Sequence, residues 1–262
     1  MTDIHPTAVV EDGARLADGV TVGPFTVIGP DVELAEAVSV QSHVVINGHT
    51  RIGARTQIFP FAAIGGPPQD TSYTDEPTKI VIGSDCVIRE QATVNRGTAR
   101  GKGVTTIGDR CMLMIGAHVA HDCVVSDDVL LVNNATLGGH SEIGEHAILG
   151  GLSAVQQNCR VGAHAFIGGV TGVTADVIPF VSALGHRAEI AGLNIVGLKR
   201  RGFDRPTIHA LRAAYKAVFD GTGSRGERLD RVAEEYADIP AAMTIVAFIR
   251  AGGDRRLALP RD

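Results

Sequence analysis

An aliphatic residue occupies every sixth position over long stretches of this sequence. The longest unbroken stretch comprises Ile107, Leu113, Val119, Val125, Leu131, Leu137, Ile143, Leu149, Val155, Val161, Ile167 and Val173. A period of six matches neither the period of an α-helix, about 3.6 residues, nor the simple alternation of a strand. It is typical of hexapeptide solenoids, in which three hexads complete one coil. The spacing therefore predicts a parallel β-helix whose interior is filled by these aliphatic residues.

The repeat begins at Ile4 and is interrupted twice by segments rich in glycine, proline and polar residues. Such segments cannot continue an aliphatic ladder, so we predict loop insertions near residues 66–79 and 99–106. The ladder ends shortly before Pro179. We therefore assign residues 1–185 to the β-helix and residues 186–262 to a connector and a C-terminal α-helical domain.

Helical spacing of apolar residues returns in the last part of the chain. Asp204 is placed to cap a helix that begins at Arg205, and further helices are expected around 225–237 and 240–251. A solenoid needs its last coil covered, so we expect these helices to pack on the open end of the prism.

Composition agrees with a regular aliphatic core. The chain has no tryptophan, and its 32 glycines suit a fold that turns a corner in every hexad. All four cysteines lie at inward hexad positions, which favours core packing over a disulfide or zinc site. The net charge of −5 gives no sign of nucleic-acid binding. The sequence contains no long apolar run of the kind that would predict a transmembrane segment. We therefore expect a cytoplasmic protein.

Stacking of coils brings residues 18 positions apart next to one another, because three hexads make one coil. On this basis His121 lies beneath Gly139, Gly139 beneath Gln157, and Asp122 beneath His140. A glycine one coil away should leave open surface beside the His121 imidazole, with backbone N–H groups within reach.

His121 is therefore the first candidate for a catalytic residue. Histidine is suited to general-base catalysis because its reference pKa, about 6.5, lies near neutral pH. A neighbouring carboxylate, Asp122 or another that the fold brings close, would fix its tautomer, and the backbone at Gly139 would stabilise an oxyanion. The alternative is that His118, His121 and His140 are polar residues on an exposed prism face, with no catalytic role.

Several segments resemble one enzyme family, the UDP-N-acetylglucosamine 3-O-acyltransferases. They are residues 4–8, 42–50, 117–123 (Ala-His-Val-Ala-His-Asp-Cys), 133–137 and 194–203 (Asn-Ile-Val-Gly-Leu-Lys-Arg-Arg-Gly-Phe). Hexads alone indicate only a large superfamily, whereas the motifs at 117–123 and 194–203 together are specific to this family.

The resemblance implies a left-handed β-helix, a homotrimer with active sites between subunits, and no metal or cofactor. It implies transfer of an (R)-3-hydroxyacyl group from acyl carrier protein to the 3-position of the UDP-sugar nucleotide, the first step of lipid A biosynthesis. His121 would be the base, Asp122 its acidic neighbour and Gly139 the oxyanion position. Positions implied to contact the sugar, phosphates or uridine are Asp70, His118, His140, Gln157, Asn194, Arg200 and Arg201. Gly169 matches the position that limits acyl-chain length, and an open groove for 12–14 carbons is implied.

Four positions depart from the family pattern. Ser72 replaces a lysine, Asn95 and Gln156 replace histidines, and Val196 replaces a glutamate. These departures leave open whether the acceptor carries a 3-hydroxyl or a 3-amino group. Basic residues expected to receive the acidic carrier protein are Arg212, Lys216, Arg225, Arg228 and Arg231.

Three other functions remain open from the sequence. A zinc-dependent carbonic anhydrase of the hexapeptide type would use His118, His121 and His140 as metal ligands. A non-catalytic β-helix scaffold would tolerate replacement of His121 without loss of any activity. The N-acyltransferase that acts later in the same pathway usually carries an extra N-terminal domain, whereas here the ladder starts at Ile4.

Overall fold

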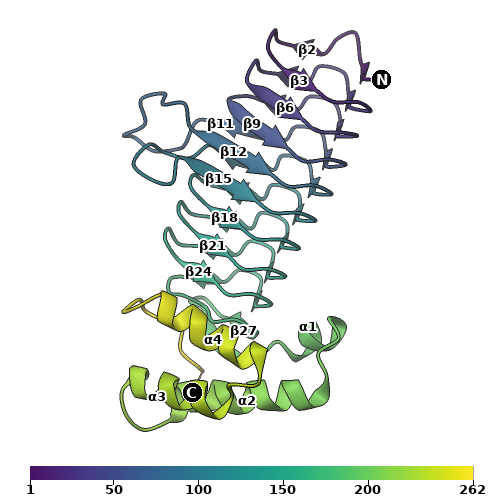
Figure 1. Ribbon diagram of the computed structural model, residues 1–262. Helices are drawn as coiled ribbons and strands as arrows, with labels where there is room; N and C mark the ends of the chain where they lie inside the picture. The colour runs from purple at the N-terminus through teal and green to yellow at the C-terminus, as the bar shows by residue number, and fades with distance from the viewer. Residues whose placement is uncertain (262) are drawn as a thin grey trace.

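Short parallel strands stack into a long three-sided prism, and helices cover one end of it (Figure 1). The structure is a computed structural model that describes residues 1–261. It confirms the expected left-handed parallel β-helix with a C-terminal helical region. Each side of the prism is one sheet, and from β1 to β26 successive strands along the chain belong to successive sheets.

The three sheets contain 11, 9 and 8 strands. The first consists of β1 (Asp3–Ile4), β4 (Thr21–Val22), β7 (Ser39–Val40), β10 (Gln57–Ile58), β13 (Val87–Ile88), β16 (Met112–Leu113), β19 (Leu130–Leu131), β22 (Ile148–Leu149), β25 (Phe166–Ile167), β27 (Val181–Leu184) and β28 (Glu189–Leu193). The second consists of β2 (Val9–Val10), β5 (Val27–Ile28), β8 (Val45–Ile46), β11 (Ala63–Gly66), β14 (Thr93–Asn95), β17 (His118–Val119), β20 (Thr136–Leu137), β23 (Ala154–Val155) and β26 (Gly172–Val173). The third consists of β3 (Arg15–Leu16), β6 (Val32–Leu34), β9 (His49–Ile52), β12 (Lys79–Ile82), β15 (Val104–Ile107), β18 (Val124–Val125), β21 (Glu142–Ile143) and β24 (Arg160–Val161).

Strand register confirms the predicted stacking of residues 18 positions apart. Val119 pairs with Leu137 on the next coil, and Leu137 pairs with Val155 on the coil after that. These aliphatic side chains are buried inside the prism, with Val119 and Leu137 fully inaccessible to solvent. Burial of this continuous column of methyl-rich side chains is the main stabilising term, at about 25 cal/mol per Å² of apolar surface.

Each corner of the prism uses a residue in the left-handed backbone region. Asp122, His140 and Asn158 form one such column, with φ angles of 58°, 59° and 66°. Asn, Asp and His tolerate this region better than most residues because their short polar groups bond locally. The repeat therefore places polar side chains at the corner that follows the second sheet.

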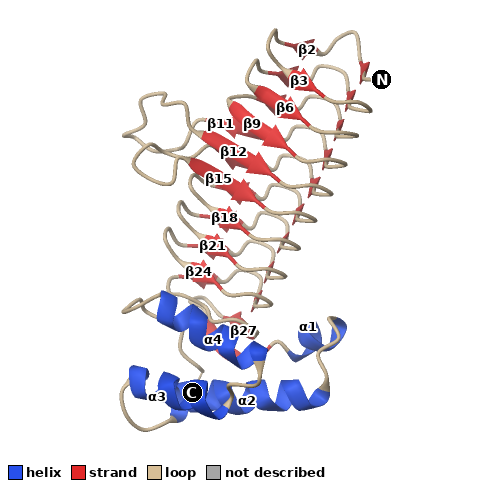
Figure 2. Cartoon of the chain, in the orientation of Figure 1, coloured by secondary structure: helices blue, strands red, loops and turns tan. Residues whose placement is uncertain are grey.

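Two loops interrupt the coils, as expected, and one projects clearly from the side of the prism (Figure 2). The first runs over residues 67–78, between β11 and β12. The second runs over residues 96–103, between β14 and β15. Because β15 already begins at Val104, the second loop starts and ends earlier along the chain than the expected 99–106.

The C-terminal region extends the first sheet before it becomes helical. β28 pairs antiparallel with β27, so strand structure continues past residue 185 to Leu193. Four helices follow: α1 (Ile195–Arg200), α2 (Arg205–Asp220), α3 (Arg225–Glu235) and α4 (Pro240–Ala251). Asp204 caps α2, since its carboxylate accepts a hydrogen bond from the Thr207 N–H at 2.9 Å. Among residues 1–261, no helix is long and apolar enough to cross a bilayer.

Candidate active site

The His121 side chain lies against Gly139 of the next coil. A Cβ atom added to Gly139 would lie only 2.5 Å from Nε2 of His121, so no larger residue fits there without moving the ring. The His121 residue is only 9% exposed. The expectation of open surface beside the imidazole was therefore wrong in detail, because the ring itself fills the space left by the missing side chain.

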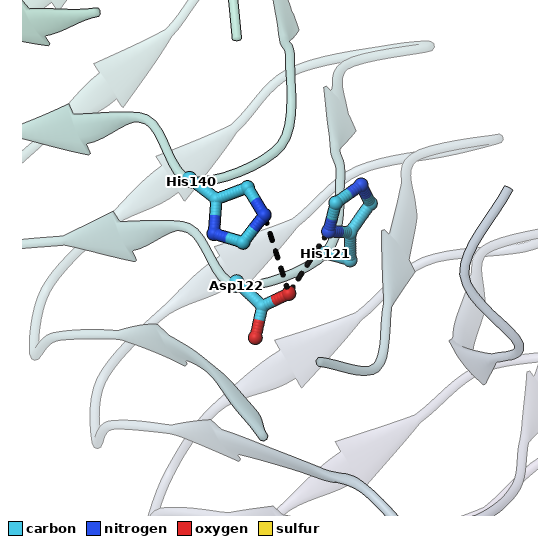
Figure 3. A group of neighbouring side chains, drawn as sticks. All are labelled: His121, Asp122 and His140. Carbon is cyan, nitrogen blue, oxygen red and sulfur yellow. Dashed lines mark hydrogen bonds and ion pairs between the residues drawn. The ribbon is translucent and has the colours of Figure 1, made fainter. Parts of the chain in front are cut away.

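Asp122 is fully buried and holds His121 in a defined orientation (Figure 3). Its Oδ2 atom lies 2.9 Å from Nδ1 of His121. With the carboxylate ionised, Nδ1 carries the proton and donates it in this hydrogen bond. The other ring nitrogen, Nε2, makes no hydrogen bond to any residue that the structure describes. Its lone pair is available to accept a proton, as a general base requires.

The second loop surrounds the Asp122 carboxylate with donors. The Thr98 N–H lies 3.0 Å from Oδ2, the Thr98 hydroxyl donates to the same oxygen at 2.7 Å, and the Gly103 N–H donates to Oδ1 at 3.0 Å. Burial raises the pKa of this carboxyl, but the bonds from Thr98 and His121 outweigh burial and hold the pKa below its usual value. Asp122 therefore remains an anion beside the imidazole at neutral pH.

His140 lies at the corner one coil above Asp122, as predicted. Its ring meets the His121 ring edge-on, with centroids 5.0 Å apart. Its Nε2 atom lies 3.8 Å from Oδ2 of Asp122, too far for a direct hydrogen bond (Figure 3). His140 is only partly buried and is thus placed to meet a molecule that approaches His121.

His118 lies on β17 and is turned toward a different neighbour. Its Nδ1 atom is 2.7 Å from the hydroxyl oxygen of Thr93, and burial lowers the pKa of its imidazole. The side chains that share metal-ligand distances here are His121, Asp122 and His140. His118 is outside that group, so within one chain the three histidines of the carbonic-anhydrase alternative are not assembled.

Gly139 also presents a backbone donor. Its neighbour His140 donates its N–H to the carbonyl of His121 at 2.9 Å, whereas the Gly139 N–H has no acceptor among residues 1–261. An unpaired N–H beside an imidazole is an arrangement that could stabilise an oxyanion.

The first loop carries Asp70. Its carboxylate is held by Ser72, one of the four residues that differ from the family pattern. The N–H and the hydroxyl of Ser72 both donate to Oδ1 of Asp70 at 2.8 Å. These bonds lower the pKa of the Asp70 carboxyl. At the base of the loop, the buried Asn95 amide donates to the carbonyl of Pro67 at 3.1 Å. Ser72 and Asn95 thus hold the loop in place, a role that their residue types alone did not indicate.

Two of the residues expected near the nucleotide, Asn194 and Arg201, lie at another corner of the prism, whereas Gln157 lies in the same column as His121 and Gly139. The Asn194 side chain caps α1 and donates to the carbonyl of His164 at 3.0 Å, while Arg201 donates to the carbonyl of His146 at 2.8 Å. His146 and His164 stack on the corner that follows the third sheet, whereas Asp122 and His140 lie on the corner that follows the second. One chain therefore places Asn194 and Arg201 on a different corner from Asp122 and His140.

The remaining candidates are exposed and make few contacts. Gln157, Arg200 and Gly169 are solvent-accessible, as are the departing residues Gln156 and Val196. A Cβ atom on Gly169 would lie 3.2 Å from the carbonyl oxygen of Gly151, so a small shift would admit a side chain.

Three of the five basic residues expected to meet the carrier protein are engaged within the helical region. Arg228 donates to the carbonyl of Val218 at 2.7 Å, and Arg225 and Arg231 also donate to backbone carbonyls. Arg212 and Lys216 are exposed on α2 and form no ion pair with any described residue.

Sequence reasoning missed the role of Thr98 and Gly103. The only signal was the break in the hexad ladder, which marks the loop but not its contacts. Thr98 lies 24 positions before Asp122 and outside the repeat, so the stacking rule could not place it.

Comparisons with known proteins agree with this architecture. The family profile described as "Udp N-acetylglucosamine O-acyltransferase; Domain 2" matches residues 176–258. An acyl-(acyl-carrier-protein)–UDP-N-acetylglucosamine O-acyltransferase from Azorhizobium caulinodans is 54% identical over 257 residues, which cover 98% of this chain and 95% of that protein. The enzyme of the same name from Sinorhizobium fredii is 47% identical, with coverage of 98% and 95%. The crystal structure of UDP-N-acetylglucosamine O-acyltransferase from Moraxella catarrhalis matches with a TM-score of 0.95 and 39% identity, covering 97% of this chain and 99% of that one.

The prism of hexapeptide coils, together with these relatives, identifies an acyltransferase of the hexapeptide-repeat class. High identity over nearly the whole length narrows the class further. The chain belongs to the UDP-N-acetylglucosamine O-acyltransferase family.

Proposed function

We propose that this protein transfers an (R)-3-hydroxyacyl group from acyl carrier protein to the 3-hydroxyl of UDP-N-acetylglucosamine, as the first step of lipid A biosynthesis. Family membership supports the reaction class and both substrates. The observation that carries the chemistry is the 2.9 Å contact between Nδ1 of His121 and buried Asp122, which leaves Nε2 free to act as a base.

The reaction follows from these groups. Nε2 of His121 removes the proton from the sugar 3-hydroxyl as its oxygen attacks the thioester carbonyl. The carbonyl oxygen becomes an oxyanion that accepts a hydrogen bond from the Gly139 N–H. The carbon–sulfur bond then breaks, the imidazolium returns its proton to the departing thiolate, and the products are the ester and the free thiol of the carrier. Asp122 stabilises the imidazolium that exists between these two proton transfers.

This sequence of steps is complete without a metal or a cofactor. A base, an anion to stabilise the imidazolium and an oxyanion donor account for both proton transfers and for the charge on the intermediate. We therefore propose that none is required. Activity retained after exhaustive dialysis against a chelator would support this proposal, and loss of activity that added zinc restores would contradict it.

We also propose that the active site is completed by a second subunit of a homotrimer. Asp70, His118 and His140 would contact the sugar, and Gln157, Asn194, Arg200 and Arg201 would receive the phosphates and uridine. Support comes from the position of Asn194 and Arg201, which lie on a different corner of the prism from Asp122 and His140. Two prisms packed side by side would form a groove between them, with one corner of each prism lining it.

Shared sites have a specific test. His121→Ala and Arg201→Ala chains are each expected to form weakly active trimers. When the two chains are unfolded together and refolded as mixed trimers, some interfaces regain one intact His121 and one intact Arg201. Activity above that of either parent supports a shared site, whereas activity at the parental average contradicts it.

The decisive experiment for the reaction is a comparison of two acceptors. The purified protein is incubated with a 14-carbon (R)-3-hydroxyacyl carrier thioester and either UDP-N-acetylglucosamine or its 3-amino analogue. Faster ester formation on the 3-hydroxyl supports the proposal. A higher kcat/KM with the amine would assign the protein as an N-acyltransferase instead, and no transfer to either acceptor would refute acyl transfer altogether.

A further inference from the structure

The loop over residues 96–103 is built around the Asp122 carboxylate. Gly97 and Gly101 approach the carboxylate so closely that a Cβ atom on Gly101 would lie 2.5 Å from Oδ2. The Gly103 N–H and the Thr98 N–H both point at it. Further from the carboxylate, Lys102 pairs with Glu142 at 2.9 Å and ties the loop to β21, which lies two coils beyond β15.

Thr98 is distinctive within this loop because its hydroxyl shares an acceptor with His121. The hydroxyl donates to Oδ2 at 2.7 Å, and Nδ1 of His121 donates to the same oxygen at 2.9 Å. Thr98 is itself only 6% exposed, so loss of its hydroxyl would leave the carboxylate oxygen without a donor that water could readily replace. With the Thr98 N–H at 3.0 Å, Oδ2 has three donors, and together they fix both the rotation of the carboxylate and the direction of its lone pairs.

We infer that Thr98 is a positioning residue, which acts through Asp122 to hold His121 in the orientation that proton transfer requires. The inference rests on the proposed role of His121 as the base. Thr98 does not reach the reacting atoms, because Asp122 lies between its hydroxyl and the imidazole. Its contribution should consequently appear in turnover rather than in substrate binding.

Thr98→Val tests the hydroxyl because valine keeps the shape and the backbone N–H but cannot donate from its side chain. We expect kcat to fall about tenfold to a hundredfold, the range for one lost hydrogen bond to a charged group, with both KM values unchanged. Thr98→Ser restores the hydroxyl and should recover most of the lost turnover. A merely structural role predicts instead a lower melting temperature with kcat preserved in the folded fraction.

A double-mutant cycle with Asp122→Ala shows whether Thr98 works through the carboxylate. In that background, adding Thr98→Val should lower kcat less than twofold, because the carboxylate that Thr98 positions is already gone. An equal loss in both backgrounds would overturn the inference, as would failure of Thr98→Ser to recover activity. If the wild-type protein turns over but Thr98→Val matches it, only this inference fails. If the wild type transfers no acyl group at all, the proposed function fails.

Discussion

Gly139→Ala is expected to disable the protein while leaving its fold intact. The new methyl group would lie 2.5 Å from Nε2 of His121. Ordinary contacts between such atoms are about 3.5 Å, so the ring or the coil must move by roughly 1 Å. A shift of about 1 Å in a catalytic group lowers turnover on the order of a hundredfold. We therefore expect kcat/KM for acyl transfer to fall by about that factor.

Gly151→Ala is the matched control for this substitution. Gly151 occupies the same hexad position on the neighbouring first sheet, and a Cβ atom there would meet nothing closer than 3.4 Å. We expect its kcat/KM to stay within about twofold of wild type, since ordinary van der Waals contact carries no steric penalty. Melting temperature and size-exclusion profiles would establish that both variants fold. If folded Gly139→Ala keeps kcat/KM within threefold of wild type, close packing of the glycine on His121 has no catalytic importance.

Three further predictions concern the base, the carrier protein and the acyl chain. His121→Ala should lower turnover by about 10²–10⁴ in a folded protein, the range for lost general-base catalysis, and single-turnover assays showing near-normal rates would contradict this. Arg212 and Lys216 are exposed on α2 and form no ion pair within residues 1–261, so reversing either charge should raise the KM for the acidic carrier about fivefold, equivalent to ~1 kcal/mol, at low salt. A KM that does not change with salt or with either substitution would exclude this surface. Gly169→Met should shift preference to donors several carbons shorter, with each excluded methylene costing ~0.8 kcal/mol or about fourfold in kcat/KM. Gly169→Ala is its control, and an identical profile over 10- to 16-carbon donors would place the length limit elsewhere.

Periodicity explains why much of the site was predictable from the sequence. The hexad register fixes which residues share a column, so the neighbours His121 and Gly139, and likewise Asp122 and His140, followed from counting alone. The same counting could not find Thr98, because Thr98 lies in a loop outside the hexad repeat. The position of this loop depends on the close approach of its own glycines to Asp122, which the repeat does not encode. Counting along the repeat also led us to expect more open space beside His121 than the structure shows. The repeat gives the position of a residue in a column but not the rotamer of its side chain.

Loop and cap conformations account for the other differences. Arg225, Arg228 and Arg231 were expected to face a partner because the carrier protein is acidic. In the structure they donate to carbonyls at helix ends and turns, which remain unpaired in any helix and attract nearby cations. Which basic side chain finds such a carbonyl depends on the local turn, and no repeat in this region indicates it.

The coil spacing sets a unit of length for the whole molecule. Successive coils are separated by the strand spacing, about 4.8 Å, and each coil contains eighteen residues. A deletion or duplication of one coil would move the helical end relative to His121 by that whole step and nothing smaller. Changes of a fraction of a step can come only from side chains on the outer surface or from the two loops. Evolution of substrate size on this scaffold is therefore expected to proceed by point substitution along the groove, and the number of coils between base and cap to stay constant.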